Sequence, residues 1–516
     1  TVAPTTTVAP TTTVASTTTV ASTTTVAPTT TAAPTTTVAP TTTVAPTTTL
    51  PSYRAPSYPS SDTELCRLSD KRGINGFTYQ EPMVEGVDYT HRNIDLDRGF
   101  VHLNPQYSNG FPLPEGMLTS VGTLPVAFLA IDFPDSPGSE SQLLDIKRIA
   151  QELNEYWAFQ SGGRFQMDFT FGDRVFHVPV DSGTYGLQSS PAPTPELTRE
   201  VIKVADPHFD FTGIEDVFML IPETNTNIAQ DWHKPPFPNR ENADGSNGDQ
   251  SILTDEGSRI HAWSGNGFYF YRPNVVSRGG VTMFYVHETL HDMGITDLYL
   301  WSPWIPGQLF KPGFTKSPMG EWDVMQDQNG NSREIISWHK WLLGWIDDEQ
   351  VYCAPLEVLT NREVSITPLT RESDGYKSII IPLTDSRMII VESRRAEGYS
   401  ANAGNMAIAV DNEDGTRQRS WLQEFGADGL LVYIYDTSLF WGEGPAKMQI
   451  PEGRPSEWRM ATCPATLCAA NDLENPWLNW DAENPGNILI ENLLDPLVRL
   501  DQFITVEGVT IELIES

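Results

Sequence analysis

The motif H-E-x-x-H-x-x-G-x-x-D, which begins at His287, carries residue types that bind a metal ion and activate water. In a helix, His287 and His291 project from one face, so both imidazoles can bind a single ion. Glu288 can then act as a general base on water without being a ligand. Gly294 permits the left-handed conformation that ends a helix, which lets the chain return Asp297 as a third ligand. Three protein ligands and one open coordination position indicate a catalytic zinc site.

The alternative without a metal site is a helix whose two histidines are ordinary polar residues and whose Gly294 is an ordinary C-cap. The chain has 9 histidines in 516 residues. A chance H-E-x-x-H is therefore rare, on the order of one per cent, and the glycine and aspartate offsets make it rarer still. A second alternative is a thermolysin-like site, in which Glu321 or Glu334 is the third ligand. The offsets of Gly294 and Asp297 argue against it.

Three blocks of the sequence resemble one known family. They are the motif with the following Leu298-Tyr299 pair, the segment Gly320–Met325 (GEWDVM) and the segment Ile336–Trp345 (ISWHKWLLGW). Together they are similar to the immune inhibitor A family of secreted bacterial zinc metallopeptidases, a metzincin-like group. The resemblance implies that Met325 forms a methionine turn beneath the zinc.

We therefore expect a secreted zinc-dependent endopeptidase that hydrolyses proteins or peptides. His287, His291 and Asp297 would hold one zinc ion, and Glu288 would be the general base. The alternative from another class is a non-catalytic cell-surface or adhesion protein with a degenerate zincin domain. Glu288 argues against that alternative, because a binding module has no use for a base.

The composition disfavours some classes of binding partner. With 33 basic and 67 acidic residues the formal net charge is −34, which disfavours binding to nucleic acid or to anionic membranes. No apolar stretch approaches the length needed to span a bilayer, so we expect no membrane insertion. The family resemblance implies a protein that is secreted or lies at the cell surface, and we expect a monomer because the sequence shows no oligomer signal. Asp327, Asn329 and Asn331 alternate as oxygen ligands after the predicted methionine turn. They are candidates for a calcium site, although their glycine is misplaced for an EF-hand loop.

Four cysteines leave two readings open. Cys463 and Cys468 can close a short loop, which would pair Cys66 with Cys353 across the predicted catalytic region. Alternatively, Cys66 binds the zinc in a latent form. An even number of cysteines in an exported chain favours the disulfides.

The sequence predicts an α+β fold with four parts. Residues 1–61 are a disordered Thr/Pro-rich repeat linker, and residues 62–118 an N-terminal extension or propeptide-like segment. Residues 119–347 are the catalytic domain, zincin-like, with a mixed sheet and an active-site helix. Residues 348–516 are a β-rich, β-sandwich-like C-terminal domain, because short apolar runs separated by turns recur there.

Within the catalytic part, hydrophobic patterns predict individual elements. Residues 124–133 form a continuous apolar run, typical of a central buried strand. Residues 165–180 alternate as two strands with a turn at Gly172-Asp173, and residues 223–262 are rich in turn formers and predict a long loop. The remaining expected elements are helices at 139–160 and 195–205 and a strand at 217–221.

Overall fold

The computed structural model describes the chain in segments. They are residues 62–71, 94–95, 100–101, 107–185, 195–222, 232–234, 251–267, 280–299, 319, 322–326, 328, 332–356, 359, 361–400, 405–411, 417–424, 428–439, 444–449, 451, 460–462, 479–480, 487–489 and 496–515. All the described residues lie within one compact unit, Ser52–Ser516. The predicted linker at 1–61 lies outside the described residues.

The first sheet is mixed, with strands in the order β4, β3, β5, β9, β6. The strands are β3 (Gly122–Asp132), β4 (Phe165–His177), β5 (Asp216–Ile221), β6 (Trp232–Lys234) and β9 (Ala262–Gly267). Neighbouring strands from β4 to β9 run parallel, and β6 pairs antiparallel with β9. Strand β3, flanked on both sides, is the central buried strand that its apolar run predicts.

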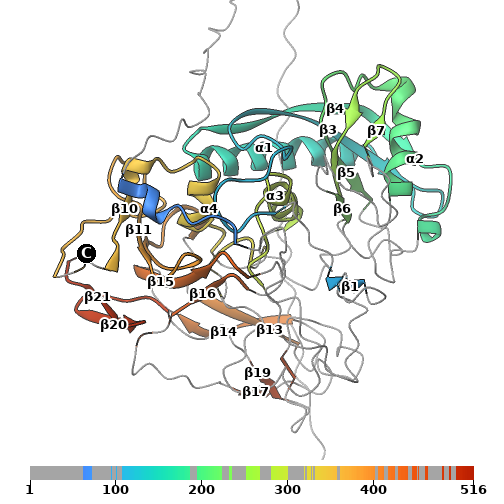
Figure 1. Cartoon of the computed structure of the whole chain (residues 1–516). Helices are drawn as coiled ribbons and strands as arrows, with labels where there is room; N and C mark the ends of the chain where they lie inside the picture. The colour runs from blue at the N-terminus through green and yellow to red at the C-terminus, as the bar shows by residue number, and fades with distance from the viewer. Residues whose placement is uncertain are drawn as a thin grey trace, which may run out of the picture. The chain divides into compact units, whose positions relative to one another are not determined.

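Helices cover both faces of this sheet (Figure 1). Alternate residues of β3 point to opposite faces. Phe128 belongs to the core formed with helices α1 (Ser141–Ser161) and α3 (Gly280–Asp292). Leu129 belongs to the core formed with helix α2 (Pro195–Ala205). Helices α1 and α2 confirm the helices expected at 139–160 and 195–205.

The strand pair expected at 165–180 is wrong, because β4 is one continuous strand. Both halves of β4 run parallel to β3, and the register shifts where Phe128 pairs with Phe171 and Ala130 with Val175. The extra residues around Gly172 therefore form a bulge rather than a reversing turn. A Cβ at Gly172 would lie 2.7 Å from the ring of Phe176, so the glycine serves close packing within the bulge.

The loop expected at 223–262 also contains strands. Strand β6 adds the antiparallel edge of the first sheet, and β7 (Ile252–Leu253) pairs with β8 (Arg259–Ile260) as a short antiparallel ladder. These strands of two or three residues are too short to show a period of two in the sequence.

A second sheet lies in the C-terminal third, with strands in the order β10, β11, β12, β15, β16. They are β10 (Val351–Cys353), β11 (Ser378–Pro382), β12 (Arg387–Arg394), β15 (Gly429–Asp436) and β16 (Ala446–Met448). The pair β10 and β11 is parallel, and the other pairs are antiparallel. The β-sandwich arrangement expected for residues 348–516 stays a prediction.

Helix α4 (Ser337–Leu342) joins the two sheets through a shared core. Its Trp338 is buried in the same apolar cluster as Phe128 of the first sheet and Tyr433 of the second. The predicted disulfide is confirmed: Cys66 is bonded to Cys353, with their Cα atoms 5.7 Å apart. Cys66 is therefore not available as a metal ligand.

Short elements complete the described chain. They are the 3-10 helices η1 (Asp62–Cys66), η2 (Ser182–Tyr185), η3 (Asp206–His208), η5 (Asp348–Gln350) and η7 (Gly398–Ser400), and the strands β1 (Ile94–Asp95), β2 (Phe100–Val101), β13 (Asn405–Asp411), β14 (Arg417–Glu424), β17 (Met460–Thr462), β18 (Asn479–Trp480), β19 (Asn487–Leu489), β20 (Gln502–Val506) and β21 (Val509–Leu513). The protein thus mixes helices with parallel and antiparallel strands.

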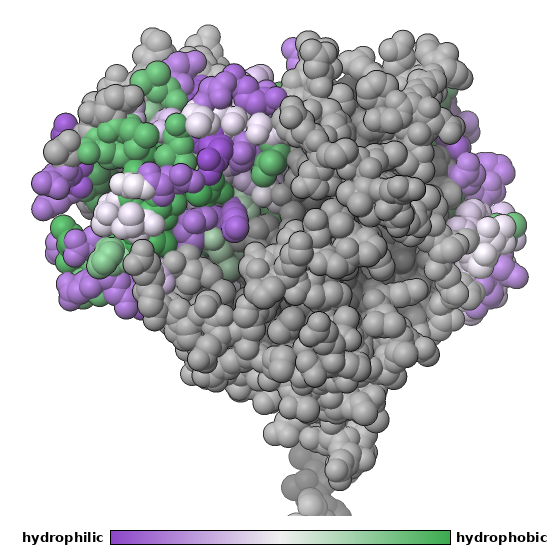
Figure 2. All heavy atoms as spheres, turned by 60° about the horizontal axis from the view of Figure 1, so that its bottom comes forward, coloured by the Kyte–Doolittle hydropathy of each residue, from purple (hydrophilic) through white to green (hydrophobic). Residues whose placement is uncertain are grey.

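The described surface is mixed in character. On the face shown in Figure 2, hydrophobic and hydrophilic residues lie beside one another at the left of the view. Among the described helices, none combines the length and the apolar character that a bilayer crossing requires.

Candidate metal centre

Helix α3 presents both histidines of the motif. The helix lies against the first sheet, where the hydroxyl of Tyr285 donates to the carbonyl of Met219 at 2.8 Å. Within residues 281–292, Glu288 alone is partly exposed, and all the others are buried. The rings of His287 and His291 lie 4.8 Å apart between centroids, as expected for residues one helical turn apart.

Helix α3 ends in a Schellman turn, which the glycine makes possible. Gly294 has a φ of 97°. The N–H of Gly294 donates to the carbonyl of His291 at 2.9 Å, and the N–H of Ile295 donates to the carbonyl of Leu290 at 2.9 Å. These are the two hydrogen bonds of the motif. Leu290 and Ile295 are both buried in the same apolar cluster.

This turn returns Asp297 to the two histidines. Asp297 Oδ1 lies 3.2 Å from Nε2 of His287 and 3.1 Å from Nε2 of His291. Ligands bound tetrahedrally at about 2.0–2.1 Å are about 3.3 Å apart, so both distances match the edges of a metal coordination tetrahedron. Within the part of the chain that the structure describes, this is the group of His, Cys, Asp or Glu residues that could hold a metal ion.

Backbone carbonyls orient both imidazoles for metal binding. Nδ1 of His287 lies 3.1 Å from the carbonyl of Val324, and Nδ1 of His291 lies 2.8 Å from the carbonyl of Ile295. A carbonyl oxygen only accepts, so each Nδ1 carries a proton, and Nε2 is the nitrogen that each imidazole offers to a metal ion. That orientation directs both Nε2 atoms toward Asp297, as in metal sites whose histidines are fixed by a second hydrogen bond.

The electrostatics of this group favour a bound cation. Burial lowers the pKa of His287, but its hydrogen bond to Asp297 and the charges of Glu288 and Asp297 raise it to about 9. Burial raises the pKa of Asp297, but the two histidines outweigh it and bring that pKa well below its usual range. Without a metal ion the group therefore retains a proton, and a metal ion would supply the positive charge instead.

The segment that carries Met325 lies against the ligands. Met325 is buried, and its carbonyl accepts the N–H of Leu298, the residue after Asp297, at 3.1 Å. The carbonyl of Val324 contacts His287, as described above. The resemblance implies a methionine turn at this place, and the described residues 322–326 bring Met325 to the metal-binding group.

Two aromatic residues lie near the ligands: Tyr299, from the Leu298-Tyr299 pair that follows the motif, and Tyr107, which no sequence motif indicated. The ring centroid of Tyr107 lies 4.7 Å from that of His291, and Tyr299 stacks on His287 at 6.4 Å. Burial first, and then the charges of Asp297 and Glu288, raise the pKa of Tyr107 well above its ordinary value. The N–H of Ser108 donates to the carbonyl of Gly294 at 2.8 Å, so the segment before the first sheet lines the centre.

The other candidate positions do not join this group. Glu334, considered as a thermolysin-like ligand, is buried beside Lys340, whose Nζ lies 3.5 Å from Glu334 Oε2. Glu321 and the calcium candidates Asp327, Asn329 and Asn331 lie outside the described residues.

Comparison with models of known protein families gave no match, and comparison with curated proteins found no similar sequence. Two imidazoles and a carboxylate nevertheless lie where a metal ion could bind.

Proposed function

We propose that this protein is a zinc-dependent endopeptidase that acts on protein or peptide substrates. The observation that carries the proposal is the placement of Asp297 Oδ1 within 3.2 Å of both histidine Nε2 atoms. Two imidazole nitrogens and one carboxylate oxygen form a donor set typical of catalytic zinc. His287, His291 and Asp297 would hold the ion and leave a coordination position open.

The chain supplies a base next to these ligands. A zinc ion bound there would act as a Lewis acid toward the scissile carbonyl and would lower the pKa of water. Glu288 follows His287 and is the partly exposed residue of an otherwise buried stretch of helix α3. Its carboxylate accepts the proton of the attacking water and passes that proton to the amine nitrogen that leaves.

Several features support the wider assignment. The mixed first sheet with helix α3 against it is compatible with a zincin-like catalytic domain, and the three sequence blocks resemble the immune inhibitor A family. A disulfide between Cys66 and Cys353 favours an oxidising compartment, and with it secretion or display at the cell surface. We also propose that the protein is a monomer and that its C-terminal domain is β-sandwich-like.

Casein digestion with and without a chelator tests the activity. We expect digestion by the zinc-loaded protein, loss of digestion after chelation and recovery with added zinc. Glu288→Ala should keep one zinc per chain and lose digestion, because the base is absent while the ligands remain. Glu196→Ala, at an exposed position of helix α2, is the matched control and should digest casein like the wild type.

Two results would contradict the proposal. Full digestion by Glu288→Ala would exclude the assigned base. A folded wild type that binds zinc but cleaves no protein would favour the non-catalytic surface or adhesion protein.

A further inference from the structure

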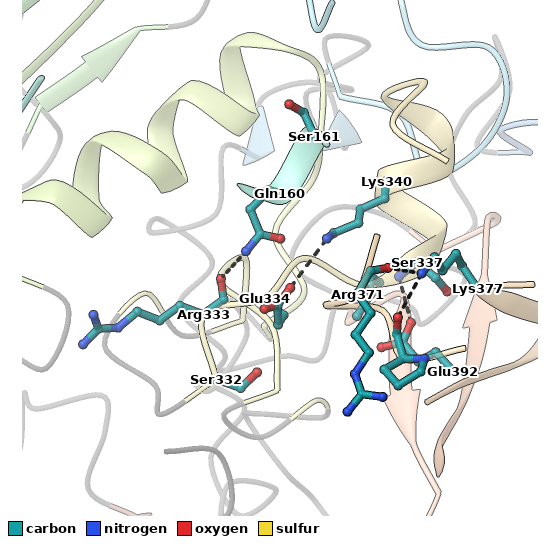
Figure 3. A network of polar contacts seen from close by, with 12 residues as sticks. Gln160, Ser161, Ser332, Arg333, Glu334, Ser337, Lys340, Arg371, Lys377 and Glu392 are labelled. Carbon is teal, nitrogen blue, oxygen red and sulfur yellow. Dashed lines mark hydrogen bonds and ion pairs between the residues drawn. The ribbon is translucent and has the colours of Figure 1, made fainter. Parts of the chain in front are cut away.

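A cluster of charged side chains is buried between the segment of Met325 and the second sheet. Its members, Asp323, Glu334, Lys340, Glu392 and Arg394, are all at most 3% exposed. Figure 3 shows Lys340 reaching toward Glu334 and Ser337 toward Glu392. Removing an ion from water costs several kcal/mol, so such a cluster is weak evidence for stability by itself.

Asp323 shapes the segment that carries Met325. Its Oδ1 accepts the N–H of Met325 at 2.6 Å, and its Oδ2 accepts the N–H of Ile336 at 2.6 Å. The first bond closes a local turn, and the second joins that turn to the start of helix α4. The N–H of Val324 in addition donates to the carbonyl of Glu334 at 3.1 Å. The carboxylate thus links residues 322–326 to the chain around residue 336.

The same segment contacts two of the metal-binding residues. Its Val324 carbonyl orients the ring of His287, and its Met325 carbonyl binds the N–H of Leu298 beside Asp297, at 3.1 Å in both cases. A displacement of this turn would therefore shift the ring of His287 and the backbone next to Asp297. Mutation of a group that hydrogen-bonds to a metal ligand typically lowers metal affinity by about 10–100-fold.

The second sheet supplies the other side of the cluster. Arg394 Nε donates to Glu392 Oε1 at 2.7 Å, and Glu392 Oε2 accepts the N–H of Ser337 at 2.8 Å and the hydroxyl of Tyr433 at 3.2 Å. Burial raises the pKa of Asp323 to about 6, while its two backbone hydrogen bonds and the charge of Arg394 act in the opposite direction. Arg394 thus favours the charged form of Asp323.

We propose that Asp323 is a positioning residue of the metal centre and that Glu392, held by Arg394 on strand β12, fixes the start of helix α4, where the N–H of Ile336 binds the Asp323 carboxylate. The C-terminal sheet is then a structural part of the metal site. This inference depends on the metal site of the proposed function, but it does not depend on peptide hydrolysis.

Asp323→Asn is the direct test, with zinc affinity as the readout. The amide can accept one of the two backbone N–H groups and turns a donor toward the other. We expect zinc to bind about 10–100-fold more weakly, measured by competition with a chelator. We also expect a changed visible spectrum of the cobalt-substituted protein, because ligand geometry changes, and a fall in kcat at similar KM.

Asp132→Asn is the matched control. Asp132 is also a buried aspartate, and its Oδ2 accepts a backbone N–H, from Gly138 at 2.7 Å, but it belongs to strand β3. We expect its zinc affinity and cobalt spectrum to equal those of the wild type, whatever its melting temperature. An Asp323→Asn variant that is folded and binds zinc within twofold of the wild type would overturn the inference and leave the proposed function intact.

A second variant keeps the test decisive should Asp323→Asn fail to fold. Arg394→Lys retains the charge and loses the guanidinium contacts to Glu392 and Ser332. We expect it to bind zinc at least threefold more weakly, and wild-type affinity would exclude the coupling to strand β12. Wild-type protein that binds no zinc would contradict both proposals, and a zinc-bound wild type without peptidase activity would contradict the proposed function only.

Discussion

Nδ1 of His291 donates a hydrogen bond of 2.8 Å to the backbone carbonyl of Ile295. Ile295 belongs to the turn that starts at Gly294 and leads to Asp297. One turn therefore orients the second ligand and returns the third. The geometry of the metal centre depends on the backbone after helix α3 as much as on the helix itself.

Gly294→Ala should weaken metal binding. Gly294 has a φ of 97°, and an L-residue in a left-handed conformation costs about 1–2 kcal/mol. We expect that loss of unfolding free energy in denaturant titrations, together with weaker zinc binding as the turn relaxes. Gly213→Ala is the control: its φ is 75° and a Cβ there meets no atom within 4 Å. It should lose similar stability and keep zinc affinity, and equal zinc affinities in the two variants would contradict the prediction.

Asp297→Ala should remove the third ligand. We expect the zinc dissociation constant to rise more than about 100-fold. This exceeds the effect of losing a group that only hydrogen-bonds to a ligand. Zinc content after dialysis against a weak chelator measures this. A folded variant that retains one zinc per chain would show that Asp297 is not a ligand.

Acid should destabilise the protein partly through His339. This residue is buried, and burial, followed by the charge of His291, lowers its pKa from 6.5 to about 3. Between pH 3 and 6.5 the unfolded chain binds a proton there and the folded chain does not. Stability from this group is therefore complete above about pH 6.5 and declines toward pH 3, by at most about 1.4 kcal/mol per pH unit.

Replacing His339 by glutamine tests this dependence. We expect the unfolding free energy of His339→Gln to fall less steeply on acidification than that of the wild type. The slope should be smaller by up to one bound proton, or about 1.4 kcal/mol per pH unit. Parallel curves for the two proteins, measured by urea denaturation at several pH values, would exclude the assignment.

Loss of the disulfide should lower stability without removing the metal. Cys66 and Cys353 are 287 residues apart, and cross-links of this kind contribute about 2–5 kcal/mol. The double variant Cys66→Ala/Cys353→Ala should unfold at lower denaturant concentration and still bind one zinc. Loss of zinc from the folded double variant would contradict this prediction and show that the metal centre needs the cross-link.

Long-range pairing limited what the sequence could predict about the fold. The helices at 141–161 and 195–205 and the central strand at 122–132 follow from local apolar patterns, because each pattern reports one buried face. The expected hairpin at Gly172-Asp173 was wrong, since a bulge and a turn share the same glycine signal. The parallel partner strand, which distinguishes the two, lies about forty residues away in the chain.

The three residues that could hold a metal ion were determined by the sequence. His287 and His291 are one helical turn apart, and Gly294 brings Asp297 back within the same local stretch, so backbone geometry alone suffices. Tertiary structure alone decided that Tyr107 contacts His291 and that Asp323 joins the turn of Met325 to the start of helix α4. Such contacts form between segments that are distant in the chain. Burial and complementary charge select the contacting residues, and no local sequence pattern predicts them.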